Sequence, residues 1–145
     1  MMKEAYLVYI IDDDEDDRFL IWQAFQKAYP ECLIFTFSNG QELVHYLTDS
    51  LGDLPHLLIM DLNMPVLNGF ETLKLLKKSP DLRKIPVVML STSCTDSDRA
   101  RCHELGVASF LVKPNSFREM QQMTSKLHKR WIHAGEETIG RFLPS

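Results

Sequence analysis

The chain has 145 residues and a formal net charge of −4, because 20 acidic residues outnumber 16 Lys and Arg residues. About 45 % of the residues are hydrophobic and 25 % are charged, as in an ordinary soluble domain. A chain of this length can bury a core without covalent cross-links, which excludes a disulfide mini-protein, a fibrous repeat and a wholly disordered chain. The mild acidity, without a basic stripe, also argues against a nucleic-acid-binding protein.

Five short apolar runs, rich in β-branched and aromatic residues, are typical of β-strands. They cover residues 6–11, 33–37, 57–60, 86–90 and 109–112. Nearly continuous apolar runs of this length predict strands that are covered on both faces, and therefore a parallel sheet.

Longer segments with apolar residues at steps of three and four follow these runs and predict amphipathic helices. Their apolar stripes lie within residues 20–28, 43–47, 70–77, 96–105 and 116–132. Five strands that alternate with five helices imply right-handed crossovers and a three-layer α/β sandwich. We expect one domain over residues 1–132, followed by a C-terminal tail over residues 133–145.

The cysteines and the N-terminus indicate a cellular compartment. Cys32, Cys94 and Cys102 lack the spacing of a metal motif, and the N-terminus lacks the apolar core of a signal peptide. An odd number of cysteines in such a chain favours reduced thiols in the cytoplasm. No stretch approaches the ~20 apolar residues of a membrane span, so we expect no membrane contact.

Polar side chains follow four of the five predicted strands. Asp12 and Asp13 follow the first strand, Asp61 the third, Ser91 the fourth and Lys113 the fifth. Ligands of open parallel sheets bind at the carboxyl ends of the strands, so this edge is the predicted functional site.

The acidic run over residues 12–17 has two interpretations. Acids at residues 14–17 suit the N-terminus of a helix, with one of them as its N-cap. Asp12, Asp13 and Asp61 around one strand-end cavity would repel each other, by ~4 kcal/mol per close pair at an effective dielectric near 20. Their oxygens suit Mg²⁺. On spacing alone, a magnesium site and a set of helix-starting and turn-forming acids both remain open.

The residue types at this edge match those used in phosphoryl transfer. A carboxylate can act as the nucleophile and become an aspartyl-phosphate. A divalent metal, an ammonium group and a hydroxyl neutralise and position the transferred group. Asp61, Lys113 and Ser91 could supply the protein's share of this chemistry.

With these motifs, the sequence resembles the receiver domain of bacterial two-component response regulators over roughly residues 5 to 132. The resemblance rests on Ile11-Asp-Asp13, Met60-Asp-Leu-Asn-Met-Pro65 with Gly69, Pro86-Val-Val-Met-Leu-Ser91 and Lys113-Pro114. It implies a flavodoxin-like fold with a five-stranded parallel sheet in the order 2-1-3-4-5. The segment over residues 77–93 is similar to the small stand-alone regulators that serve phytochrome-type sensor kinases.

The resemblance implies a role for each of the strand-end residues. Asp61 would be the phospho-acceptor, and Ser91 and Lys113 would contact the phosphoryl group. Phe110 would be the aromatic member of a switch that it forms with Ser91. The peptide bond before Pro114 would be cis, as is usual in this family.

The resemblance also implies a Mg²⁺ cofactor. Asp13 and Asp61 would bind the ion, with support from Asp12 and with the backbone carbonyl of Asn63 as a further ligand.

The implied function is that of a single-domain response regulator, which accepts a phosphoryl group from a sensor histidine kinase or a phosphotransfer protein. Its phosphorylation would change a protein-binding surface. Such a protein is not an enzyme with a separate substrate, since it catalyses only its own phosphorylation and dephosphorylation. A homodimer is a further candidate assembly.

Three other functions remain alternatives. A magnesium-dependent aspartyl phosphatase of the haloacid dehalogenase type would match Asp12-x-Asp14, but such an enzyme has its nucleophile on the first strand and usually carries a cap insertion that is missing here. A flavin- or nucleotide-binding module would need a phosphate-binding loop where this chain has six consecutive acids. A receiver-like scaffold that is never phosphorylated would not need the strand-end carboxylates, ammonium and hydroxyl.

Overall fold

A five-stranded parallel sheet forms the centre of the computed structural model, which describes residues 6–49 and 54–133. The strands are β1 (Tyr6–Ile11), β2 (Cys32–Phe37), β3 (Leu57–Asp61), β4 (Val87–Ser91) and β5 (Ser109–Val112). Their order is β2-β1-β3-β4-β5, so the predicted fold class and strand order are confirmed.

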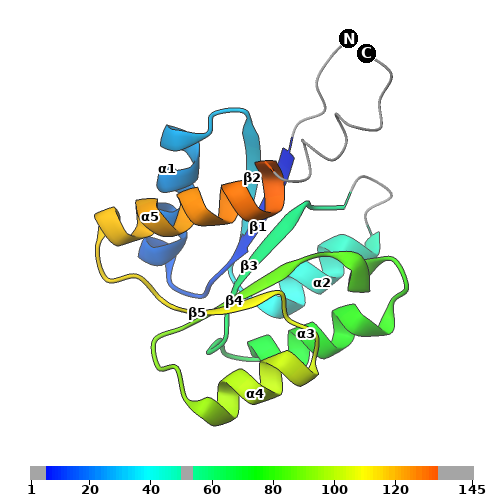
Figure 1. Ribbon diagram of the computed structural model, residues 1–145. Helices are drawn as coiled ribbons and strands as arrows, with labels where there is room; N and C mark the ends of the chain where they lie inside the picture. The colour runs from blue at the N-terminus through cyan, green and yellow to red at the C-terminus, as the bar shows by residue number, and fades with distance from the viewer. Residues whose placement is uncertain (1–5, 50–53, 134–145) are drawn as a thin grey trace.

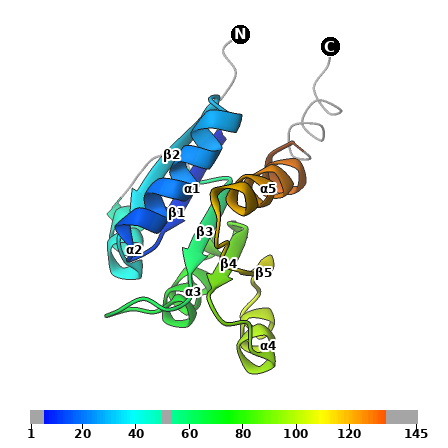
Figure 2. The same ribbon diagram turned by 90° about the vertical axis from the view of Figure 1, so that its left-hand side faces the viewer.

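The helices cover both faces of the sheet (Figures 1 and 2). They are α1 (Glu15–Ala28), α2 (Gly40–Asp49), α3 (Gly69–Lys78), α4 (Asp96–Glu104) and α5 (Phe117–Leu127), with a 3-10 turn, η1 (Leu82–Lys84), before β4. The helices α1 and α5 pack on one face, and α2, α3 and α4 pack on the other. This arrangement is the three-layer sandwich that the alternating pattern predicts.

Two hydrophobic cores lie on either side of the sheet because successive strand residues point to opposite faces. In β1, Val8 and Ile10 pack against α1 and α5, whereas Tyr9 and Ile11 pack towards α2 and α3. All four side chains are almost completely buried. The continuous apolar run of β1 thus contributes side chains to both hydrophobic cores.

The edge strand β2 departs from the prediction that every strand is covered on both faces. Leu33 is 49 % exposed and Phe35 is 43 % exposed. The sequence run is as apolar as the others, but β2 has a single neighbour, β1, and lies at the rim of the sheet.

The end of the last helix also differs from the sequence prediction. The apolar stripe predicts one helix over residues 116–132, but α5 ends at Leu127. A π-helical turn, η2 (His128–His133), follows it. The predicted tail from residue 133 lies almost wholly outside the described residues, which end at residue 133. No helix of the described part is long and apolar enough to cross a membrane.

Two tight backbone positions lie in the connection from β3 to α3, at Val66 and Gly69. Gly69 begins α3 so close to the sheet that a Cβ atom there would lie 2.7 Å from Met89 Sδ and 2.9 Å from Leu62 Cα. In the preceding loop, Val66 has a φ of 67°. Leu67 N donates a 2.7 Å hydrogen bond to Pro65 O across it, as in the rare, strained γ-turn.

Candidate functional site

Three carboxylates meet at the carboxyl ends of β1 and β3. Asp12 directly follows β1, Asp13 is the next residue, and Asp61 is the last residue of β3. Each offers an oxygen, and these oxygens all lie within 4.8 Å of one another. Asp12 and Asp61 are buried, whereas Asp13 is exposed to solvent. We call Asp12, Asp13 and Asp61 the acidic cluster.

Lys113, which follows β5, supplies the positive charge beside the acidic cluster. Its Nζ atom lies 2.7 Å from Asp12 Oδ2, 2.8 Å from Asp17 Oδ2 and 3.5 Å from Asp61 Oδ2. Lys113 is itself 9 % exposed. One ammonium group therefore pairs with three carboxylates, and Asp13 adds a fourth negative charge beside two of them, which leaves an excess of negative charge.

This excess and the burial shift the pKa values of the site. Desolvation and the negative charge of Asp12, which Lys113 offsets only in part, together raise the pKa of Asp61 to about 6. Desolvation also raises the pKa of Asp12. Burial alone would lower the pKa of Lys113, but its hydrogen bonds to Asp12 and Asp17 raise it above the ordinary range, so this side chain stays charged.

Backbone contacts fix the acidic loop between β1 and α1. Asp14 is the N-cap of α1, and its side chain accepts hydrogen bonds from the backbone N–H groups of Asp16 and Asp17. Asp12 Oδ1 accepts a 2.9 Å bond from Asp14 N. Arg18 Nη1 donates a 2.6 Å bond to Asp12 O. The acidic run over residues 12–17 therefore contains both acids that begin α1 and acids that belong to the functional site.

Asp17 is the site residue that the sequence analysis missed, because it was interpreted as one of the helix-starting acids. It lies in the first turn of α1, and its carboxylate pairs with Lys113. No pattern in the sequence separates Asp17 from the other first-turn acids, Glu15 and Asp16, because its pairing with Lys113 depends on how α1 packs beside the end of β5.

Ser91 ends β4 and Lys113 directly follows the neighbouring strand β5, and Lys113 N donates a 2.8 Å hydrogen bond to Ser91 O. The Ser91 side chain is fully buried. Its Oγ atom donates a 2.7 Å bond to Ser93 O and accepts one from Ser93 N. The hydroxyl is therefore bonded to the loop before α4 rather than directed at Asp61.

Phe110 lies in β5, three residues before Lys113, and is 4 % exposed. The Arg99 guanidinium of α4 lies 5.4 Å from the centre of its ring. Phe110 thus packs inward beneath α4. The described residues have no cis peptide bond, so the cis isomer expected before Pro114 is absent from this structure.

The acidic cluster fits a hard divalent cation. Three carboxylates from two chain segments converge on one point, and one of them, Asp13, is open to solvent. Mg²⁺ prefers carboxylate and carbonyl oxygens and keeps several water ligands, which an exposed rim permits. Asn63, which would offer a carbonyl, is exposed, and its N–H donates to Asp61 Oδ1 at 3.3 Å.

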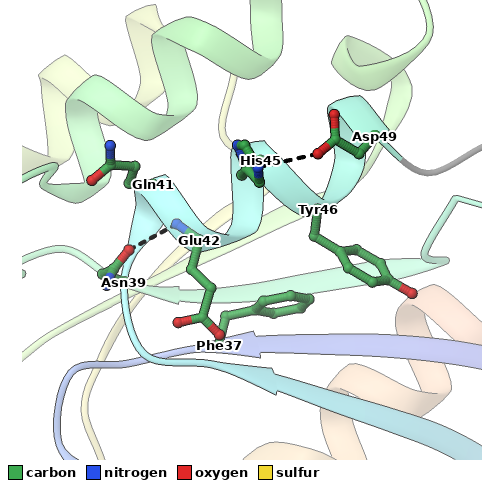
Figure 3. A pocket seen from close by; sticks show the side chains of 7 residues that line it. All are labelled: Phe37, Asn39, Gln41, Glu42, His45, Tyr46 and Asp49. Carbon is green, nitrogen blue, oxygen red and sulfur yellow. Dashed lines mark hydrogen bonds and ion pairs between the residues drawn. The ribbon is translucent and has the colours of Figure 1, made fainter.

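A separate hollow of about 660 Å³ lies beside α2 and the end of β2 (Figure 3). Phe37 and Tyr46 form its aromatic side, with ring centroids 5.4 Å apart. His45 and Asp49 pair along the exposed face of α2. None of the strand-end candidate residues lines this hollow, so it is separate from the acidic cluster.

Curated relatives match most of this chain. A probable methanogenesis regulatory protein, FilR2, of Methanothrix harundinacea is 30 % identical over 133 residues, which is 90 % of this chain and 86 % of the relative. The response regulator Rcp1 of Synechocystis is 26 % identical over 131 residues, with 87 % and 88 % covered.

Solved structures show the same fold. The phosphorylated cyanobacterial phytochrome response regulator RcpA superposes with a TM-score of 0.82 at 27 % identity, covering 89 % of this chain and 95 % of that chain. The Mn²⁺-bound form of Rcp1 superposes with a TM-score of 0.78 at 25 % identity, covering 88 % and 94 %. The sequence model of the response regulator receiver domain matches residues 8–125, and the chain therefore belongs to this family.

Proposed function

We propose that this protein is a phosphorylation-controlled response regulator in which Asp61 accepts a phosphoryl group from a phosphohistidine. The observation that carries the proposal is the convergence of Asp12, Asp13 and Asp61 within 4.8 Å, with the Lys113 ammonium beside them. Family membership supports it, because receiver domains accept phosphoryl groups on an aspartate.

The proposed reaction is the attack of an Asp61 carboxylate oxygen on the phosphorus atom. A P–O bond to Asp61 forms as the P–N bond to the donor histidine breaks, and the imidazole leaves with the electron pair and takes up a proton. Asp61 must be ionised to attack. Its pKa of about 6 still leaves it ionised at neutral pH.

Two side chains would stabilise the transferred group. Lys113 already faces Asp61 at 3.5 Å and stays charged, so it can pair with a phosphoryl oxygen. Ser91 ends the adjacent strand and can donate its hydroxyl after it releases Ser93 O. Catalysis of this kind depends on positioning and charge neutralisation.

We assign the cofactor as Mg²⁺, held by Asp13, Asp61 and the Asn63 carbonyl, with Asp12 in support. The bound cation would neutralise charge on the phosphoryl oxygens. Removal of the carboxylate repulsion is a second benefit, since the cluster has more negative charge than Lys113 balances.

The proposed output is a population shift at the surface formed by α4 and β5. When Ser91 turns towards the phosphoryl group, the loop before α4 loses the bond between Ser91 Oγ and Ser93 O. Phe110 can then fill the vacated space and move relative to Arg99. A covalent change at Asp61 would thereby alter a binding face.

We further propose a cytoplasmic protein whose donor is a sensor histidine kinase or a phosphotransfer protein, and whose signal passes through protein contacts, including a homodimer. It turns over no separate substrate and catalyses only its own phosphorylation and dephosphorylation. Nucleic acid and membrane are not proposed as partners.

Incubation with acetyl phosphate tests the proposal directly. Intact-mass measurement should show the addition of one phosphoryl group in the presence of Mg²⁺ and none in excess chelator. Asp61→Asn should abolish the addition. Asp16→Asn is the matched control, because Asp16 is an exposed acid of the same run and should be phosphorylated normally. Undiminished phosphorylation of Asp61→Asn would exclude Asp61 as the acceptor.

A further inference from the structure

A second group of metal-ligand side chains lies at the other end of the sheet, away from the acidic cluster. Glu31 and Cys32 stand at the start of β2, and His128 stands directly after α5. A carboxylate oxygen, the thiol sulfur and an imidazole nitrogen of these residues lie within 4.8 Å of one another. Figure 1 shows the start of β2 beside the end of α5.

We propose that Glu31, Cys32 and His128 form a binding site for a transition-metal ion, with Zn²⁺ as the fitting ion. This site is independent of the phosphorylation that we propose for Asp61. A Cys–His–carboxylate donor set is typical of zinc, whereas Mg²⁺ prefers oxygen ligands alone.

The distance between two of the ligands supports the assignment. His128 Nε2 lies 3.4 Å from Glu31 Oε1. Nitrogen and oxygen ligands at about 2.0–2.2 Å from a tetrahedral zinc ion lie roughly 3.4 Å apart. The imidazole and the carboxylate therefore already have a separation that suits one shared ion.

The surroundings hold the imidazole in place. The Tyr29 ring stacks on the His128 ring with centroids 3.6 Å apart and planes 4° from parallel. The Tyr29 hydroxyl lies 3.4 Å from Ser125 Oγ of α5, which ties this stack to the helix. Orientation of a ligand by such contacts favours metal binding because less freedom is lost on binding.

Burial differs among the three ligands in a way that allows an ion to enter. Cys32 is 1 % exposed, whereas the Glu31 side chain is 55 % exposed. The exposed Glu31 carboxylate is free to move aside and admit the ion, whereas the buried Cys32 thiol is held in place by the residues around it. The fourth tetrahedral position would take a water molecule.

Binding requires the Cys32 thiol to lose its proton. A Zn–S bond forms as the S–H bond breaks, and the proton passes to the buffer. Burial raises the pKa of Cys32 to about 11, so in the absence of metal the thiol is protonated. The affinity should therefore fall as the pH is lowered.

Cobalt titration of the full-length protein without an affinity tag tests the site. Excess Mg²⁺ is present to occupy the acidic cluster. The expected result is a thiolate-to-cobalt charge-transfer band that saturates at one equivalent of Co²⁺ and disappears when Zn²⁺ is added. Zn²⁺ should also raise the Tm of the protein.

Substitutions test whether the cobalt band arises from the proposed ligands and not from other residues of the chain. Cys32→Ser should remove the band, and His128→Gln should weaken binding by more than the ~10- to 100-fold typical of outer-shell changes. Cys102→Ser, at another buried cysteine, and Asp61→Asn should leave the band unchanged.

Two results would overturn the proposal. One is the absence of a thiolate band in the unmodified protein, and the other is a band that survives Cys32→Ser or is lost in Cys102→Ser. If Cys32→Ser does not fold, His128→Gln decides, because its unchanged cobalt affinity would equally exclude the site.

Discussion

Replacement of Asp61 by Asn should stabilise the metal-free protein at alkaline pH. The substitution keeps the shape of the side chain and removes one negative charge from the acidic cluster. Lys113 keeps its two shorter contacts, to Asp12 at 2.7 Å and to Asp17 at 2.8 Å. The main effect is therefore that the variant lacks the charge repulsion and the desolvation penalty of the ionised Asp61 carboxylate.

The pKa shift sets the magnitude. Folding raises the pKa of Asp61 from 3.8 to about 6, so the folded state favours the protonated carboxyl. Each unit corresponds to about 1.4 kcal/mol, which makes the penalty at most about 3 kcal/mol. The penalty is fully present above pH 6, shrinks as the pH falls towards 3.8, and is absent below that value.

Urea unfolding at pH 8 and at pH 4, in chelator and in Mg²⁺, measures this effect. In chelator at pH 8, Asp61→Asn should exceed the unsubstituted protein in free energy of unfolding by about 1–3 kcal/mol. At pH 4 the difference should nearly vanish. Mg²⁺ should stabilise the unsubstituted protein more than the variant, because the ion binds the folded state through Asp61.

The matched control is Asp16→Asn, which removes an exposed acid from the same run. It should change the stability by a few tenths of a kcal/mol, through its place in the first turn of α1. If Asp61→Asn is no more stable than the unsubstituted protein in chelator at pH 8, the carboxylates do not repel each other as the geometry requires.

Three further substitutions test the backbone around the site by urea unfolding. Val66→Gly should raise stability by up to about 1 kcal/mol, because glycine adopts the φ of 67° without steric cost; a loss would show that the loop is unstrained. Asp14→Ala should lower stability by about 1 kcal/mol through loss of the N-cap bonds, and an unchanged midpoint would contradict the cap. Gly69→Ala should cost about 1–3 kcal/mol, because its Cβ would lie 2.9 Å from Leu62 Cα; full stability would show that α3 can move away from β3.

Some of the site follows from the order of residues along the chain. Apolar runs predict the strands, and parallel strands place their carboxyl ends at one edge. Asp12, Asp61 and Lys113 each follow or end a strand, and in the structure their charged groups meet within 3.5 Å of the Lys113 nitrogen. The acidic cluster was therefore predictable, although the chemical roles of its members remain proposals.

Other features depend on how separate elements pack. Asp12 and Asp13 are neighbours in sequence, yet the first is buried and the second exposed, because the chain leaves the sheet between them. Asp17 reaches Lys113 because of the rotation of α1 relative to β5. Local patterns give the spacing of residues within one helix or strand but not the rotation of one element against another.

The chain by itself determined which elements form, because periodicities of two and 3.6 residues are local properties of the backbone. Tertiary structure decided which side chains from distant segments meet. The exposure of Leu33 in β2, the pairing of Asp17 with Lys113 and the meeting of Cys32 with His128 belong to this second kind. Each depends on a contact, or on a missing cover, between residues far apart in the sequence, and packing of the whole domain is what fixes such distances.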